Sequence, residues 1–188
     1  MPAIAEKAKP RYQGMRVTRE IYLDLEDDGY KYDMIDGVLQ MSPSANFYHN
    51  RLISKLLMLI ENHLAEKQIN AMPAPETDLL LPDGEDTLRP DICIILKKNY
   101  EIIQTHIHGV PDVIVEVLSD TTRKRDLGEK ADRYLQNGVS EYWIADPDEK
   151  RLAIWINKNK TGWEKKEGES IASSVLEGFT IQAKDIFG

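Results

Sequence analysis

Apolar residues recur every three or four positions along residues 46–68, which predicts a long amphipathic helix packed on a core. These residues are Ile53, Leu56, Leu57, Ile60 and Leu64. A second segment, 121–138, shows the same spacing in Leu127, Ala131, Tyr134 and Leu135, and Gly138 is placed to end the helix. Near the start of the chain, Thr18 is a suitable N-cap for a short helix that extends to about Asp27.

Shorter apolar runs bounded by turn residues predict strands. The Asp36–Gly37 pair lies between two such runs in residues 30–41, which is typical of a β-hairpin. Four buried strands are expected at 76–81, 91–96, 112–119 and 141–146. The last part of the chain predicts further short strands at 151–158, 162–168 and 179–188.

The order of these elements predicts a mixed α/β (or α+β) fold with a mixed central sheet. Residues 112–146 form a strand–helix–strand unit, so the two strands of that unit are expected to be parallel neighbours. The chain has 188 residues, a length that suits a single domain. We expect a flexible leader over residues 1–16 and one domain over residues 17–188.

Composition and charge indicate the cellular compartment and the kinds of partner that this protein can have. The single cysteine, Cys93, excludes an intrachain disulfide and fits a reducing compartment. No apolar run approaches the roughly 18 residues of a membrane span, so we expect a cytoplasmic protein without a membrane partner. The net charge of −8 argues against a broad basic face for nucleic acid. It does not exclude a nuclease whose carboxylates bind a metal ion, because the ion supplies positive charge.

Two Pro-Asp pairs, ending in Asp91 and Asp112, each open an apolar run. If the strands that follow them pair antiparallel, Asp91 approaches Glu116, whereas Asp112 lies about 13 Å away. Two adjacent carboxylates repel each other unless a divalent cation lies between them. Mg²⁺ or Mn²⁺ prefers oxygen ligands, and the carbonyl of Val117 would be a third one. The sequence therefore predicts a metal site at Asp91, Glu116 and Val117.

A cation that orients the attacking water is expected near these carboxylates. Leu118 shares the face of Glu116 on its strand, so that position offers no amine. Lys130 falls within the apolar stripe of the following helix, where a lysine is unexpected unless it reaches a partner. We therefore predict that Asp91, Glu116 and Lys130 form a catalytic group.

Structural alternatives exist for each of these residues. Asp91 could simply start a strand, and Glu116 could lie on an exposed face of the sheet. Lys130 could extend its ammonium to solvent at the border of the apolar stripe.

Several segments resemble the Uma-two family of restriction-endonuclease-like proteins, within the PD-(D/E)xK nuclease superfamily. The resemblance covers about residues 17–188 and is most specific in the last third of the chain. The matching stretches are YDMIDGVLQMSPS with His49, RPDICII, PDVIVEVLSDTTRKRD, GEKADRYLQNGVSEYWIADP and the terminal DIF.

This resemblance implies an αβββαβ core with added strands, Mg²⁺-dependent cleavage of phosphodiester bonds and a homodimer. It also implies that Asp91 and Glu116 bind the metal. By the family pattern, the lysine has moved from position 118 to Lys130 on the helix.

Four further residues are candidates for accessory roles: Asp33, His49, Arg89 and Arg123. The resemblance implies an acidic residue at Asp33, and His49 lies one turn before the apolar stripe of its helix. His49 could reach the metal site or could be a hydrogen-bonded core histidine. Arg89 and Arg123, the latter in the basic run 123–125, could contact phosphates.

The leading functional hypothesis is an Mg²⁺- or Mn²⁺-dependent endonuclease that acts on nucleic acid, with DNA as the expected substrate. The acidic charge and Leu118 favour an alternative, in which a catalytically inactive nuclease fold binds nucleic acid or a protein. A third hypothesis is a hydrolase of small phosphodiesters or nucleotides.

Overall fold

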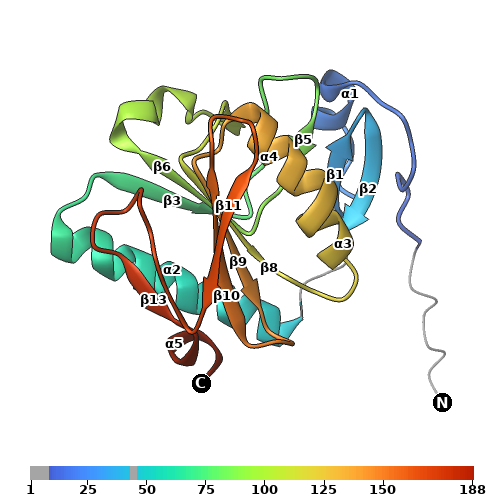
Figure 1. Ribbon diagram of the computed structural model, residues 1–188. Helices are drawn as coiled ribbons and strands as arrows, with labels where there is room; N and C mark the ends of the chain where they lie inside the picture. Colours follow the sequence, from blue (N-terminus) through green and yellow to red (C-terminus); the bar gives the residue numbers. More distant parts are fainter. Residues whose placement is uncertain (1–8, 43–45) are drawn as a thin grey trace, which may run out of the picture.

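The computed structural model describes residues 9–42 and 46–188. Its centre is a six-stranded sheet in the order β11-β10-β9-β8-β6-β3 (Figure 1). Only the β8–β9 pair is parallel among these neighbours, which confirms the predicted mixed sheet. The strands are β3 (Ala71–Pro75), β6 (Ile92–Leu96), β8 (Val113–Val117), β9 (Glu141–Asp146), β10 (Arg151–Asn157) and β11 (Trp163–Gly168).

Helices cover both faces of this sheet. Helix α2 (Phe47–Lys67) begins at Asn46, whose side chain accepts a hydrogen bond from the N–H of His49. It buries four apolar side chains against one face of the sheet: Ile53, Leu56, Ile60 and Leu64. The other face packs against α4 (Ala131–Asn137), which follows a short α3 (Arg123–Arg125) and a π-helical turn, η2 (Asp126–Lys130). The chain therefore contains the expected αβββαβ order, in α2, β3, β6, β8, the α3–α4 segment and β9.

A second sheet lies on the α4 side, in the order β2-β1-β5-β4-β7 (Figure 1). Its hairpin turns at Asp36 and Gly37, both of which have positive φ angles, as a tight two-residue turn requires. This confirms the predicted hairpin. The strands are β1 (Lys31–Ile35), β2 (Val38–Ser42), β4 (Leu79–Leu80), β5 (Thr87–Leu88) and β7 (Ile107–His108).

The remaining elements are short. They are α1 (Arg19–Leu23), η1 (Lys97–Ile102), β12 (Ser170–Ala172), β13 (Thr180–Gln182) and α5 (Ala183–Phe187). Strands β12 and β13 pair with each other, and α5 contributes Ala183 and Ile186 to the core under α2.

One predicted boundary and one predicted element are wrong, and one strand was not predicted. Helix α1 ends at Leu23 instead of Asp27, because side chains of Asp27 and Asp28 bond to the backbone two residues on and form turns. Residues 183–187 form a helix instead of a strand. Strand β3 was not predicted, since Pro73 and Pro75 argue against a strand, yet β3 is an edge strand that tolerates them.

The π-helical turn explains a fourth difference. Leu127 was expected on the buried stripe but is 37% exposed. A π-helical turn contains more residues than an α-helical one, so side chains that follow it are rotated relative to an ideal helix. Asp126 and Lys130 consequently face the interior, each at most 3% exposed.

The N-terminal segment is already packed within the range expected to be a leader. Tyr12 is buried beside Tyr32, and the N–H of Gly14 donates to the carbonyl of Leu39 in β2. Residues 1–8 lie outside the described part of the chain, and for them the leader stays a prediction.

Candidate active site at the ends of two antiparallel strands

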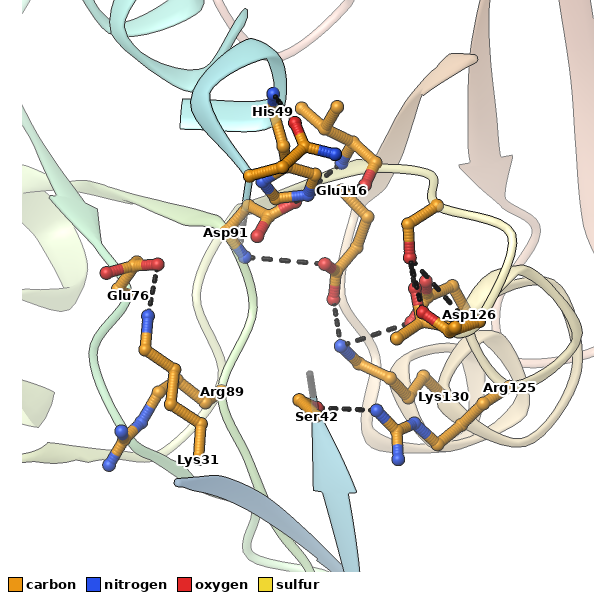
Figure 2. Close-up of a pocket in the computed structure, with 15 residues that line it drawn as sticks. Lys31, Ser42, His49, Glu76, Arg89, Asp91, Glu116, Arg125, Asp126 and Lys130 are labelled. Atoms are coloured by element: carbon orange, nitrogen blue, oxygen red, sulfur yellow. Dashed lines mark hydrogen bonds and ion pairs between the residues drawn. The ribbon is translucent and has the colours of Figure 1, made fainter. Parts of the chain in front are cut away.

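The pairing of β6 with β8 brings Asp91 and Glu116 together. The two strands are antiparallel, and Ile92 lies opposite Val115. Asp91 precedes β6 and therefore lies across from Glu116, near the end of β8. The N–H of Asp91 is 3.4 Å from Oε2 of Glu116 (Figure 2). The predicted antiparallel register, and with it the approach of these two residues, is confirmed.

His49 joins this pair from the first turn of α2. Its Nε2 atom is 2.9 Å from the carbonyl oxygen of Val117 and 3.4 Å from Oδ2 of Asp91. The same Oδ2 atom accepts a hydrogen bond of 2.7 Å from the N–H of Val117. The imidazole therefore connects the helix to the ends of both strands. Its Nδ1 atom is buried and has no hydrogen-bond partner among the described residues.

Lys130 reaches the site from the π-helical turn. Its ammonium forms an ion pair with Oε1 of Glu116, and both side chains are 4% exposed (Figure 2). A second carboxylate, Asp126, lies 3.4 Å from the same Nζ atom. The hydroxyl of Tyr134 donates to Oε1 of Glu116 at 3.1 Å. Glu116 and Lys130 are thus buried together, and neither of the alternatives that place them at an exposed surface holds.

Burial dominates the electrostatics of this group. Burial raises the pKa of Glu116 well above its ordinary value, with further contributions from Asp126 and Asp91 and an opposing one from Lys130. Burial also raises the pKa of Asp91, which His49 opposes. Burial alone would lower the pKa of Lys130, but the carboxylates of Asp33, Glu116 and Asp126 raise it well above its ordinary value. Lys130 is therefore charged. Its single positive charge lies near three carboxylates, so it cannot neutralise all of them.

Asp33 and Arg89 border this group. Asp33 is 1% exposed, accepts the N–H of Arg89 at 2.8 Å and forms an ion pair of 3.1 Å with Arg125. The guanidinium of Arg89 donates two hydrogen bonds, of 2.7 and 2.9 Å, to Asp78. Both arginines line the same cavity as Asp91 and Glu116.

Arg123 does not belong to this cavity. Its guanidinium pairs with Asp146, the last residue of β9, and with Asp148 in the turn that follows, and it does not line the cavity wall. Arg125 lines the wall instead, two residues along the same basic run. Leu118 is 2% exposed within the core on the α4 side. Of the cations in this region, Lys130 is the one that pairs with Glu116.

The cavity has a volume of about 180 Å³ and is lined mainly by polar and charged side chains (Figure 2). Its acidic members are Glu76, Asp91, Glu116 and Asp126, and its basic members are Lys31, Arg89, Arg125 and Lys130. Ser42, Asn46, His49, Val117, Ser119, Thr121 and Thr122 complete the wall. The basic side chains of this lining suit an anionic substrate, and the acidic side chains lie beside them.

The donor set fits a hard cation with few protein ligands. Asp91 and Glu116 offer carboxylate oxygens, and burial, which raises the pKa of both, makes their ionised forms costly without a nearby cation. Mg²⁺ is usually held by one or two carboxylates and retains several waters. In residues 9–42 and 46–188, no three His, Cys, Asp or Glu side chains are grouped to enclose a metal ion. The carbonyl of Val117, predicted as a ligand, is in contact with His49.

Sequence reasoning missed several of the lining residues. Asp126 lies four residues before Lys130, and this spacing was the signal that could have revealed it as a partner of the lysine. Tyr134 was assigned to the apolar stripe, but its hydroxyl contacts Glu116. Lys31, Ser42 and Glu76 come from or near the second sheet, whose position relative to the first was not predictable from the sequence pattern.

An αβββαβ core with converging carboxylates at the ends of neighbouring strands defines the restriction-endonuclease-like class of folds. Residues 19–184 match the model of the Uma2 family, which is described as "Putative restriction endonuclease". Because the match spans most of the chain, the protein belongs to the Uma2 family. The predicted family and fold class are confirmed.

The fold is also similar to a crystal structure described as "a putative nuclease belonging to DUF820 from Anabaena variabilis". The TM-score is 0.76 at 18% sequence identity, and the alignment covers 91% of this chain and 97% of that one. No curated protein sequence matches the chain. Across the described residues, none of the helices combines the length and apolar character needed to cross a membrane.

Proposed function

We propose that this protein is a metal-dependent nuclease that hydrolyses phosphodiester bonds of DNA. One observation carries the proposal: Asp91, Glu116 and Lys130 converge from two strands and a helix on one cavity. Membership of the Uma2 family supports the same activity. The name of the Anabaena protein, which shares the fold, is consistent with it.

In this proposal, Asp91 and Glu116 hold Mg²⁺ or Mn²⁺. The bound ion would activate a water molecule and compensate the negative charge that develops on the phosphate. Burial makes this role favourable, since ionisation of either carboxylate is costly without a nearby cation. The carbonyl of Val117 stays a candidate third ligand.

Lys130 and His49 position groups around the two carboxylates. Lys130 keeps its charge and lies beside Glu116, where it can orient a water molecule or stabilise a phosphate oxygen. His49 holds the end of β8 through the carbonyl of Val117 and lies next to Asp91. It therefore fixes the geometry of Asp91 relative to Glu116.

Arginines supply the contacts for the phosphate backbone. Arg89 and Arg125 line the cavity, and both are held by buried or partly buried carboxylates that fix their orientation. Planar guanidinium groups suit phosphate oxygens, because they donate two parallel hydrogen bonds. Asp33 acts on this group indirectly, through Arg125 and the N–H of Arg89.

The proposal is tested by a cleavage assay on plasmid and single-stranded DNA with Mg²⁺ or Mn²⁺. The variants are Asp91→Asn, Glu116→Gln and Lys130→Met, purified in parallel with the wild type. The expected result is metal-dependent cleavage by the wild type that each variant loses. Equal cleavage by the wild type and Glu116→Gln would assign the activity to a contaminant.

A second function has one structural observation in its favour. Leu118, directly after β8, occupies the place where the superfamily pattern has lysine, and it is buried. We therefore also consider a catalytically inactive module that binds nucleic acid or a protein partner. Titration calorimetry separates the two, because an absence of Mg²⁺ and Mn²⁺ binding at millimolar concentration supports the inactive module.

Assembly and location belong to the same proposal. We propose a homodimer in the cytoplasm, and the single cysteine, which is buried, is compatible with a reducing compartment. Sedimentation equilibrium of the full chain measures the number of subunits directly.

A further inference from the structure

Two aromatic side chains at the start of α2 are exposed to an unusual degree. Phe47 is 72% exposed and Tyr48 is 75% exposed, more than any other large hydrophobic side chain in the described part of the chain. Exposure of two adjacent aromatic rings gives up the stabilisation that burial would provide. Such a surface is typical of a binding site.

Their position relates them to the candidate active site. Phe47 and Tyr48 lie between Asn46 and His49, and both of those residues line the cavity. Two residues of a helix span about 3 Å along its axis. The two rings therefore lie at the end of α2 that also carries His49, which Figure 2 shows beside the cavity.

The two rings are arranged as a pair. Their centroids are 5.6 Å apart, and their planes meet at 80°, which is an edge-to-face contact. This contact uses the edge of one ring and leaves a ring face open. The pair therefore offers an exposed aromatic ring face to a ligand.

The charge around the pair favours an anionic ligand. Residues 46–60 include Arg51 and Lys55 but no Asp or Glu, although the whole chain has a net charge of −8. Arg51 is exposed and lies one turn after Phe47, on the same side of the helix. The first turn of this 21-residue helix adds the positive end of its dipole.

We propose that Phe47 and Tyr48 form a stacking platform for an unpaired nucleobase beside the scissile phosphate. This inference rests on the proposed nuclease function and names its substrate class: nucleic acid that is single-stranded or locally unpaired. Single strands expose base faces that stack on aromatic side chains, while a duplex already has its bases stacked. Arg51 would pair with a neighbouring phosphate.

Binding to metal-free protein tests the platform without any need for cleavage. The probe is a single-stranded oligonucleotide that carries 2-aminopurine, whose fluorescence is quenched when the base stacks. The expected result is quenching by the wild type in EDTA. The Phe47→Ala/Tyr48→Ala variant should bind at least about fivefold more weakly and lose the quenching, since one stacked base contributes roughly 1–3 kcal/mol.

Two controls separate stacking from other effects. The variant Phe47→Tyr/Tyr48→Phe keeps both rings and should bind and quench as the wild type does. Met58→Ala removes another exposed apolar side chain, 55% exposed and on the same side of α2, about 16 Å further along the helix. It should leave binding unchanged. The high exposure of all three residues makes loss of folding unexpected, and a thermal melt checks it.

Four results would overturn the inference. They are absence of binding by the wild type, unchanged quenching in the double alanine variant, an equal loss in Met58→Ala, and stronger binding to a fully paired duplex. The double alanine variant could also be a monomer in sedimentation where the wild type is a dimer, while its quenching is unchanged. This result would show that the rings contact a second copy of this chain instead.

The experiments test the proposed nuclease function and the stacking platform independently of each other. If Glu116→Gln abolishes Mn²⁺-dependent cleavage while the double alanine variant quenches normally, the nuclease proposal holds and the platform is overturned. If no variant-sensitive cleavage occurs but the quenching depends on Phe47 and Tyr48, the platform holds and the nuclease proposal fails.

Discussion

Two glutamates lie buried on the adjacent strands β8 and β9, and their surroundings differ. Glu116 is 3% exposed and Glu141 is 0% exposed. In the parallel pairing, Glu141 lies opposite Val113 and Glu116 lies opposite Ile144, so the two carboxylates occupy opposite ends of the strand pair. One end opens into the cavity, and the other is closed by the C-terminal segment.

Neutral donors form all the hydrogen bonds to the carboxylate of Glu141 among the described residues. Its carboxylate accepts hydrogen bonds from Nε1 of Trp143 at 2.8 Å and from Oγ of Ser173 at 2.7 Å. The N–H and the hydroxyl of Ser174 each donate at 2.6 Å. The three donors of Ser173 and Ser174 attach the segment before β13 to the central sheet. The carboxylate is therefore a structural element of the fold.

Glu116 is surrounded by charges instead. Lys130 contacts it, two further carboxylates raise its pKa in addition to burial, and the cavity lies alongside. Burial of a carboxylate is thus not by itself a sign of function. The difference lies in the partners. Neutral donors hydrogen-bond the carboxylate of Glu141, whereas neighbouring carboxylates make the ionised form of Glu116 costly unless a cation binds.

The largest effect is expected at Glu116. Glu116→Gln keeps the shape of the side chain and removes its charge, so a bound cation loses one of its two carboxylates. Loss of about 4 kcal/mol of transition-state stabilisation lowers the rate of Mn²⁺-dependent cleavage about a thousandfold. Single-turnover cleavage measures this rate. Retention of the rate within tenfold would contradict the proposed role.

Glu141 is expected to affect stability instead of activity. Glu141→Ala leaves four donors without their acceptor, of which the indole N–H of Trp143 is buried, and this should lower the free energy of unfolding by about 2 kcal/mol. Urea unfolding measures this change, and cleavage per folded molecule should equal that of the wild type. Glu169→Ala, at an exposed position near β12, is the matched control and should change stability little. A specific loss of activity in folded Glu141→Ala would contradict the distinction.

Two arginines of the basic run after β8 also have different surroundings. Arg125 lines the cavity, and Arg123 pairs with Asp146 and Asp148 outside it. Arg125→Lys keeps the charge but not the planar donor geometry, so the KM for DNA should rise about tenfold. Arg123→Lys should leave KM within about twofold. Steady-state kinetics on a short oligonucleotide compares them, and the reverse ranking would show that the phosphate contact lies at Arg123.

A smaller effect is expected for Asp91 in the metal-free protein. Burial raises the pKa of Asp91 in the folded state, so its contribution to stability is present at acidic pH and is lost as the pH rises through the folded pKa. Asp91→Asn has no such loss. Its stability relative to the wild type should therefore increase as the pH rises from acidic to neutral. Urea unfolding in EDTA measures it, and a constant difference would contradict the raised pKa.

Strands β6 and β8 were predictable because both are continuous apolar runs that begin at a Pro-Asp pair. Their antiparallel pairing was assumed, and it places Asp91 near Glu116. Lys130 was predictable for a different reason, since a lysine on a buried helical face requires a partner. These three residues come from neighbouring elements of the core, so local pattern and strand order were sufficient.

Other features depend on geometry that the pattern does not encode. The π-helical turn rotates Asp126 inward and Leu127 outward, and a search for α-helical spacing assigns Leu127 to the wrong side. Strand β3 was missed because Pro73 reads as a break, although an edge strand accommodates it.

A crystal structure of the protein soaked in Mn²⁺ shows whether Asp91 and Glu116 hold a metal ion. We expect one strong anomalous peak in the cavity, within coordination distance of carboxylate oxygens of both residues. A fully occupied Mn²⁺ elsewhere, or an empty cavity at millimolar Mn²⁺ with both carboxylates ionised, would contradict this expectation.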